Sequence, residues 1–385
     1  MRFTPAGKRF RWIPLPSVLL GLLLISAHGR AVSSPAPNGL LPTGSMQKAR
    51  ANHTASLLGD GSVLVAGGFG GGHLEWQPFV STELFDPATG AFHPGPDMTV
   101  PRFGHAAAVL KDSRILLVGG WSGAGGVTNR AEVYDPVTRR FSRVGDMAVA
   151  RGESTATLLP DGRVLVTGGV DRNDRAISSA EIFDPRSNSF SATGAMALPR
   201  SQHVATALAD GTVLITGGGS CDCTARKIYR EAELFEPSAG KFIPAGNLAS
   251  ARYKHTAVLL ADGKVLVAGG SDARDWQGLM SSAEIYDPSS RSFEPLPAMN
   301  ASRFKFPYAA VRLPSGDVFI AGGARFAELF RQKEQNFVKL PGDFETARYF
   351  GSATLLSDGR VLVAGGYSEG PGGLPATSRA WLYRP

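Results

Sequence analysis

The stretch RYKHTAVLLADGKVLVAGG, from Arg252 to Gly270, decides the fold because the chain repeats it seven times. Every copy opens on an arginine and closes on a glycine pair. These arginines are Arg50, Arg102, Arg151, Arg200, Arg252, Arg303 and Arg348, at steps of 45 to 52 residues. Self-similarity with a period of about 50 residues is typical of propellers and solenoids.

Each copy has the pattern of four short strands. Two apolar runs rich in β-branched residues flank an Asp-Gly pair or a variant of it, which is the signature of a tight hairpin. A third strand begins with a glutamate in six copies and ends in Asp-Pro in most of them, and a fourth carries an aromatic residue. The six glutamates are Glu83, Glu132, Glu181, Glu233, Glu284 and Glu328. The pattern predicts an all-β fold, a propeller of seven four-stranded blades.

The first 31 residues have the pattern of a signal peptide. Four basic residues precede the apolar run from Val18 to Ile25, and small residues follow it. We therefore expect an exported protein that is periplasmic, at the cell surface or secreted, with no membrane insertion after cleavage. Five of the positive charges lie in residues 1–30, so the net charge of +7 falls to about +2 in the mature chain. That value gives no indication of nucleic-acid binding, and we expect a monomer.

The two ends of the mature chain complement each other. Residues 32–37 form a linker, and residues 38–46 match the fourth strand of another copy, with Leu40 in the place of its aromatic residue. The last copy stops after its third strand, at Trp381 to Pro385. We expect these two segments to pair and to close the ring, because closure removes exposed strand edges. The expected blades are approximately 48–98, 99–147, 148–196, 197–248, 249–299, 300–344 and 345–385 plus 38–46.

The repeated glycine pair, the Glu-x-Tyr/Phe-Asp-Pro sequence of the third strand and the aromatic residue of the fourth resemble the kelch repeat. The resemblance covers residues 38–385. The amino-acid sequence of copies three and seven is similar to that of exported microbial kelch proteins and of the propeller of galactose oxidase. Two departures are visible: phenylalanine replaces the usual tryptophan of strand four, and copy six, from Arg303, is degenerate. A shared fold does not by itself carry function.

A copper radical oxidase of the galactose oxidase kind requires a tyrosine crosslinked to a cysteine, a second tyrosine and two histidines around the metal. Tyr253 and Tyr349 stand near the start of inner strands, where such ligands belong. The cysteines Cys221 and Cys223, however, fall in the loop after Gly218. We therefore expect neither copper nor any other cofactor.

The two cysteines and the repeated histidines have simpler interpretations. For Cys221 and Cys223 we expect first a local disulfide, second a redox-active or intermolecular thiol and third a metal site, because zinc requires four ligands. Four histidines fall three residues after a blade arginine. They are His53, His105, His203 and His255. Since they lie on different blades, they are expected to be structural rather than metal ligands.

The long loops between strands two and three differ from copy to copy, so we expect the ligand to bind on their face. The aromatic candidates for stacking on a sugar or gripping a protein are Trp76, Trp121, Trp276, Tyr367, Tyr253 and Tyr349. An alternative is that these rings only cover neighbouring loops. The blade arginines stand at the start of the first strands, on the same face as the long loops. Because they repeat in step with the glutamates, we favour structural ion pairs over a ligand-binding ring.

The sequence leaves three functions open. The first is a module that binds a carbohydrate or a protein through the face with long loops. The second is a carbohydrate-active enzyme on that face, such as an epimerase or a lyase, or an oxidase related to galactose oxidase. The third is an architectural protein of the cell envelope. Ionisable side chains with perturbed pKa values at the channel mouth would favour the enzyme.

Overall fold

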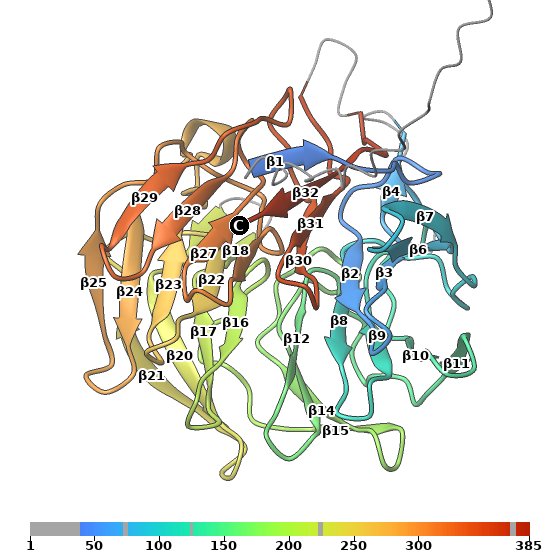
Figure 1. Cartoon of the computed structure of the whole chain (residues 1–385). Coiled ribbons are helices and arrows are strands. Elements are labelled where there is room, and N and C mark those ends of the chain that lie inside the picture. Colours follow the sequence, from blue (N-terminus) through green and yellow to red (C-terminus); the bar gives the residue numbers. More distant parts are fainter. Residues whose placement is uncertain (1–38, 72–75, 124–125, 222–225, 370–374) are drawn as a thin grey trace, which may run out of the picture. The chain divides into compact units, whose positions relative to one another are not determined.

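The computed structural model describes residues 39–71, 76–123, 126–221, 226–369 and 375–385. These residues form seven antiparallel sheets of four strands, arranged as the blades of a propeller (Figure 1). The expected signal peptide (1–31), the linker (32–37) and Cys223 lie outside the described residues. No helix in the described part of the chain is long and apolar enough to cross a membrane.

Each of the first six blades is built from consecutive strands, with the first strand innermost. Their bounds are β2 (Thr54–Leu57), β3 (Val63–Ala66), β6 (Thr82–Asp86) and β7 (Ala91–Pro94) in blade 1; β8 (Ala106–Val109), β9 (Ile115–Val118), β10 (Ala131–Asp135) and β11 (Arg140–Arg143) in blade 2; β12 (Thr155–Leu158), β13 (Val164–Thr167), β14 (Ala180–Asp184) and β15 (Ser189–Ala192) in blade 3; β16 (Val204–Ala207), β17 (Val213–Thr216), β20 (Glu231–Glu236) and β21 (Lys241–Asn247) in blade 4; β22 (Thr256–Leu259), β23 (Val265–Ala268), β24 (Ala283–Asp287) and β25 (Ser292–Leu296) in blade 5; β26 (Ala310–Arg312), β27 (Val318–Ile320), β28 (Glu328–Arg331) and β29 (Asn336–Lys339) in blade 6.

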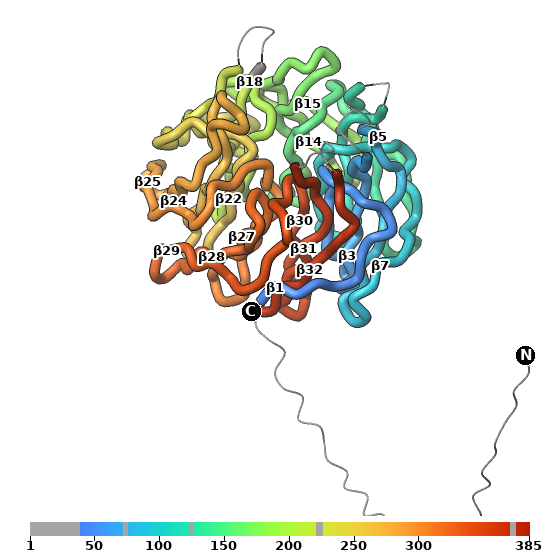
Figure 2. The backbone as a smooth tube through the Cα atoms, turned by 90° about the horizontal axis from the view of Figure 1, so that it is seen from above, coloured from blue at the N-terminus to red at the C-terminus, as the bar shows by residue number. Residues whose placement is uncertain are grey.

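Blade 7 combines both ends of the described chain. Strands β30 (Ser352–Leu355), β31 (Val361–Ala364) and β32 (Ala380–Arg384) take their fourth partner from β1 (Gly39–Pro42). Leu40 pairs with Tyr383 and Pro42 with Trp381, so the expected closure is present. Figure 2 shows the blue β1 beside the red β32 at the point where the ring of blades meets itself. The strand ends at Pro42, which is shorter than the stretch to Met46 expected from the sequence.

The apolar core lies between the blades. The second strands are buried along their whole length, as in Val164–Thr167, because both faces of each blade pack against a neighbour. This explains why their sequences are continuous apolar runs rather than alternating ones. The first strands contact one another around the full ring, from β2 through β8, β12, β16, β22 and β26 to β30 and back.

Two further hairpins and a short helix lie in the long loops. Strands β4 (Phe69–Gly70) and β5 (Gln77–Pro78) pair in blade 1, and β18 (Gly219–Cys221) pairs with β19 (Arg226–Ile228) in blade 4. Blade 5 carries the 3-10 helix η2 (Asp275–Gln277). These additions carry side chains such as Arg226 in β19 and Trp276 in the helix.

Candidate functional site

The glycine pair and the blade arginine join each blade to the next. The second glycine of every pair donates its N–H to the carbonyl of the following blade's arginine, as Gly120 does to Arg151 at 2.9 Å. A Cβ on Gly119 would lie 2.2 Å from that same carbonyl oxygen, and both glycines have positive φ. Only glycine satisfies both conditions, which explains why the pair recurs in every copy.

The arginine side chains are structural. In six blades the guanidinium group is fully buried and forms an ion pair of 2.7 to 2.9 Å with the glutamate of the third strand. The pairs are Arg50–Glu83, Arg102–Glu132, Arg151–Glu181, Arg200–Glu233, Arg252–Glu284 and Arg303–Glu328. The same guanidinium groups also donate to the first glycine's carbonyl, and the glutamates accept N–H groups from the segment before each arginine. These contacts satisfy both charges, so the arginines do not form a ligand-binding ring.

Blade 7 differs because Trp381 replaces the glutamate. The Arg348 guanidinium lies 5.6 Å from the centre of the Trp381 ring and donates to the carbonyl of Phe344. Among the described residues no carboxylate lies within 4 Å of it. Burial lowers the pKa of Arg348 from its ordinary value. The arginine of this blade is therefore held by an aromatic ring and a carbonyl.

The repeated histidines also join neighbouring blades. The Nε2 atom of His105 lies 2.9 Å from the Thr54 hydroxyl, and that of His255 lies 2.9 Å from the Thr216 hydroxyl. His53 and His203 make the same kind of contact, and burial lowers the pKa of each to about 3. These imidazoles are neutral structural groups, and within the described ranges no three His, Cys, Asp or Glu side chains gather to hold a metal ion.

The residue two positions after each blade arginine was not predicted from the sequence to belong to a site. These seven residues, here called the channel ring, are Asn52, Gly104, Glu153, Gln202, Lys254, Lys305 and Phe350. Each donates its backbone N–H to the carbonyl of its counterpart in the preceding blade, at 2.7 to 3.4 Å, so the hydrogen bonds run around the whole propeller. All seven have φ between 51° and 58°, although only one is glycine. Left-handed backbone is unfavourable for most side chains, and such outliers cluster at functional sites.

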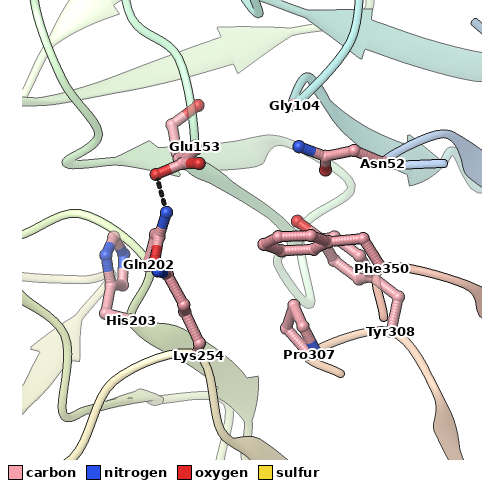
Figure 3. A pocket seen from close by; sticks show the side chains of 10 residues that line it. Asn52, Gly104, Glu153, Gln202, His203, Lys254, Pro307, Tyr308 and Phe350 are labelled. Carbon is pink, nitrogen blue, oxygen red and sulfur yellow. Dashed lines mark hydrogen bonds between the residues drawn. The ribbon is translucent and has the colours of Figure 1, made fainter. Parts of the chain in front are cut away.

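The channel ring encloses a small central cavity. Residues from all seven blades line it, and its volume of about 30 Å³ accommodates water rather than an organic ligand. Figure 3 shows Glu153, Gln202, Asn52 and Phe350 facing this common space, with Glu153 hydrogen-bonded to Gln202. Burial raises the pKa of the Glu153 carboxyl, which Lys254 opposes. Six of the seven channel-ring residues thus line one cavity, and Lys305 does not.

The six aromatic candidates contribute to a continuous arc around the mouth of the channel. Successive ring centres lie 4.9 to 6.3 Å apart. In order, this aromatic arc consists of Trp121, Phe103, Phe69, Tyr367, Tyr349, Trp276, Phe304 and Tyr253. Trp76 stacks on Phe69 and remains half exposed. The other rings mostly cover one another, so the arc is a wall and only part of it is available for stacking.

The arc is interrupted at blades 3 and 4, where small residues replace the aromatic ones. Gly152 and Ser201 take the positions that Tyr253 and Tyr349 hold in their own blades. A Cβ on Gly152 would lie 2.7 Å from the Trp121 indole, so this glycine allows the arc to end there. The gap leaves a polar recess of about 150 Å³. Its polar lining includes Glu153, Ser201, Gln202, Arg226, Tyr253 and Lys254.

Charged side chains gather on one side of the polar recess. Arg226 donates to the Tyr253 hydroxyl at 2.6 Å and pairs with Asp275 at 3.2 Å, and Lys254 reaches the same carboxylate at 3.5 Å. Lys305 does not line the recess: its ammonium lies 4.1 Å from the centre of the Trp276 ring and donates to the Tyr367 hydroxyl at 2.7 Å. Burial and the neighbouring Lys254 lower the pKa of Lys305 to about 7. Burial likewise raises the pKa of both tyrosines.

Comparison with known proteins agrees with this architecture. The sequence profile of the Kelch motif matches residues 50–99, 101–148, 154–196 and 252–300. The chain is a seven-bladed propeller with kelch motifs in four of its blades. The kelch motif is matched in blades 1, 2, 3 and 5; blade 4 carries an additional hairpin, blade 6 lacks Asp-Pro, and blade 7 takes its last strand from the N-terminal end.

A solved structure with a similar fold is that of a fungal alcohol oxidase of the AA5 family, in complex with copper. It has a TM-score of 0.69 and 18% sequence identity, over 90% of this chain and 75% of that chain. At 18% identity this similarity shows that the two proteins share a fold and shows nothing about activity. No curated protein sequence matches the chain.

The described residues do not supply the ligand set of a copper oxidase. Tyr253 is engaged by Arg226, and Tyr349 packs edge-on against Trp276. The four histidines are separated among blades and bonded to serine or threonine hydroxyls. Since none of these groups converges on one point in the described part of the kelch propeller, we derive no chemistry through a metal.

Proposed function

We propose that this kelch propeller is an exported binding protein that holds a small saccharide in the polar recess. The observation that carries the proposal is the gap in the aromatic arc, where Tyr253 borders a hollow lined by hydroxyl, amide and charged groups. Such a polar hollow suits a sugar, whose hydroxyls form hydrogen bonds with groups of this kind.

The shape of the mouth favours a sugar over a protein partner. The recess of about 150 Å³ is smaller than the ~300 Å³ at which pockets for drug-sized ligands begin. A stable protein interface buries ~800 Å² per partner and usually presents exposed aromatic anchors. Of the aromatic residues described around the channel, the exposed large rings are Trp76 and Tyr308, and Tyr308 lines the central cavity.

The test is a glycan array followed by calorimetric titration on the mature chain and two variants. Ser201→Tyr places in the recess the residue that blade 5 carries at the same position, so we expect the fold to persist and sugar binding to be lost. Val137→Tyr, at an exposed turn between strands three and four, is the matched control and leaves binding unchanged. Binding that survives Ser201→Tyr would refute the recess as the site.

A second candidate is a carbohydrate-active enzyme at the same recess. The observation in its favour is that ionisable groups with shifted pKa values line the recess: burial raises the pKa of Glu153 and lowers that of Lys254. A carboxyl and an amine of this kind are suited to moving protons at neutral pH. Incubation of the sugars bound by the protein in D₂O, followed by NMR, tests this: exchange of a carbon-bound proton or a new isomer supports catalysis, and unchanged spectra refute it.

A further inference from the structure

We propose that a cleft between blades 1 and 2, on the face opposite the long loops, binds the guanidinium group of an arginine in a partner peptide. This blade 1–2 cleft has a volume of about 440 Å³. The lining residues that matter here are Asp60, Ser62, Tyr134, Pro136 and Arg139. The cleft is separate from the polar recess, so the inference goes beyond the proposed function.

Equivalent clefts of this propeller are filled by its own arginines. Arg360 in the hairpin turn of blade 7 pairs through Nε with Asp358 at 2.7 Å and donates to the Pro87 carbonyl of blade 1 at 2.7 Å. Arg114 of blade 2 repeats both contacts, with the aspartate of its own turn at 2.8 Å and with the proline carbonyl of blade 3 at 3.3 Å. A guanidinium group suits this place because its planar fork reaches both acceptors at once.

The blade 1–2 cleft keeps these acceptors and lacks the arginine. Ser62 stands where Arg360 stands in blade 7, and Pro136 corresponds to Pro87. Asp60 accepts the N–H and the hydroxyl of Ser62 on Oδ1, at 3.0 and 2.6 Å, so the turn itself is intact. Its Oδ2 atom, which corresponds to the oxygen that holds Nε in the other two turns, has no cation within 4 Å in the described part of the chain.

Tyr134 provides a second observation that points to a ligand. Its side chain is buried, with 1% exposed, and the residue lines the cleft. Its hydroxyl forms no hydrogen bond with any residue that the structure describes. Buried hydroxyl groups normally have a partner. A phenol oxygen can accept an N–H of a bound guanidinium, which would supply that partner.

The aromatic residue at this position of strand three varies with the hairpin turn of the preceding blade. It is phenylalanine where the turn carries arginine or lysine, and tyrosine where it carries neither. Thus Phe85, Phe183, Phe235 and Phe330 accompany Arg360, Arg114, Arg163 and Lys264, whereas Tyr134, Tyr286 and Tyr383 accompany Ser62, Thr212 and Asp317. The tyrosine hydroxyl therefore replaces a cation that belongs to the same cleft.

The other two tyrosine clefts differ from the one at Tyr134. In the cleft of Tyr383, Arg331 already pairs with Asp317 at 2.8 Å, so the chain supplies its own guanidinium. The Tyr286 hydroxyl is closed to solvent. Tyr134 instead lines an open hollow, and an arginine from outside the chain can reach it.

The charges around the blade 1–2 cleft favour a cation. Two carboxylates, Asp60 and Asp86, line it together with one guanidinium, Arg139, and the imidazole of His93. Hydrogen bonds within its own turn occupy both oxygens of Asp86, so Asp60 is the acceptor for a ligand. Arg139 lies in an exposed turn and forms no ion pair with a described residue, although its charge helps to lower the pKa of Asp60.

The test is an NMR titration of the mature chain with three blocked peptides, Gly-Arg-Gly, Gly-Lys-Gly and Gly-citrulline-Gly. Citrulline keeps the shape of arginine and lacks its charge. We expect the arginine peptide to bind at least tenfold more tightly than the other two, and more weakly as NaCl is added. Arg139→Ser should leave this binding unchanged or strengthen it, because Arg139 repels a bound cation.

Two variants locate the site. Ser62→Arg places in the cleft the residue that blade 7 carries, so we expect the fold to persist and peptide binding to fall at least tenfold. Asp60→Asn keeps an acceptor for the turn and removes the charge, with a loss of the same size. Asp262→Asn is the matched control, because Asp262 accepts the N–H of Lys264 in the equivalent turn of blade 5 and lies outside the cleft.

Every other result overturns the inference. Equal binding of the citrulline peptide would show that the charge is not recognised, and binding that survives Ser62→Arg would place the site elsewhere. Preference for a blocked Gly-Glu-Gly peptide would make the cleft an anion site at Arg139. Dimers of the mature chain that Ser62→Arg dissociates would assign the cleft to a second copy of this chain. Absence of binding at several millimolar of each peptide would refute the site itself, whereas sugar binding in the recess is tested separately.

Discussion

The blade arginine and the residue two positions after it behave in opposite ways, although they lie in the same repeat. The first is identical in all seven blades, buried, and paired with a glutamate in six of them. The second is the channel ring, in which six residue types occupy one backbone conformation. The uniform position holds the blades together, and the varied position gives the channel mouth its chemistry. The positions that depart from the repeat are therefore the ones at which the proposed function can be tested.

Removing the strand that closes the ring produces the largest expected effect, on the scaffold side of this comparison. A chain that begins at Gln47 lacks β1, which exposes the edge of β32 and removes Leu40 from the core. We expect loss of cooperative unfolding and concentration-dependent aggregation, measured by circular dichroism and light scattering. A chain that begins at Val32 is the control. Cooperative unfolding of the shorter chain would contradict closure by β1.

Glu132→Gln breaks one buried ion pair. It leaves the Arg102 charge buried without its partner, so the free energy of unfolding in urea should fall by about 3 to 5 kcal/mol. Arg348→Met in blade 7 is the matched comparison, because that arginine contacts an aromatic ring instead of a glutamate. Its loss should cost only about 1 kcal/mol. Equal losses in the two variants would show that the pairs are not what makes this position uniform.

Lowering the pH tests the neutral histidines between the blades. The folded-state pKa of His53 and His203 is about 3, well below the ordinary 6.5, so the unfolded chain takes up these protons first. Their contribution to stability is complete above pH 6.5 and is lost as the pH falls toward 3. Each histidine should lower the free energy of unfolding by up to about 1.4 kcal/mol per pH unit between pH 6 and 5.

The same urea titration at pH 7, 6 and 5 carries its own control. In His203→Asn the decline between pH 6 and 5 should be shallower than in the unchanged chain, because one of the protons is no longer taken up. A decline of the same steepness would mean that His203 is not neutral in the folded propeller. The contacts between the histidines and the hydroxyl groups would then not depend on a neutral imidazole.

The smallest effect is a change of pKa in the channel ring without a change of fold. Lys254→Met removes a positive charge beside Lys305, so the pKa of Lys305 should rise above its value of about 7. Glu153→Gln removes a negative charge and should lower it. Competitive labelling with acetic anhydride, read by mass spectrometry across pH, measures both shifts. Lys264, whose pKa is raised by Asp287, serves as the internal control.

The channel ring and the scaffold should respond differently to this last pair of changes. Because Asp275 keeps its ion pair with Arg226 when Lys254 is replaced, and glutamine can still accept the hydrogen bond at position 153, we expect the free energy of unfolding to fall less than in Glu132→Gln. A pKa of Lys305 that stays unchanged in both variants would mean that these side chains do not interact. The convergence of the channel ring would then have no electrostatic consequence.

The repeat itself predicted the fold, the closure and the arginine–glutamate pairs, because each follows from residues that recur at fixed spacing. Asp-Gly turns, glycine pairs and apolar runs specify strands locally, and a strand left over at one end matches a strand missing at the other. The aromatic candidates were also visible in the sequence. Their packing into one arc was not, because Phe69, Phe103 and Phe304 complete it and each lies in a different blade.

Only the tertiary structure decided where the chemistry lies. Glu153, Gln202, Lys254 and Lys305 are about 50 residues apart in the sequence, and each looks like an ordinary polar residue beside an arginine. The sequence determined that every blade presents this position to the axis. The circular arrangement of seven blades brought the seven positions together, and burial there lowered the pKa of Lys305. Both the convergence and the burial depend on ring closure, a property of the whole chain that no single repeat contains.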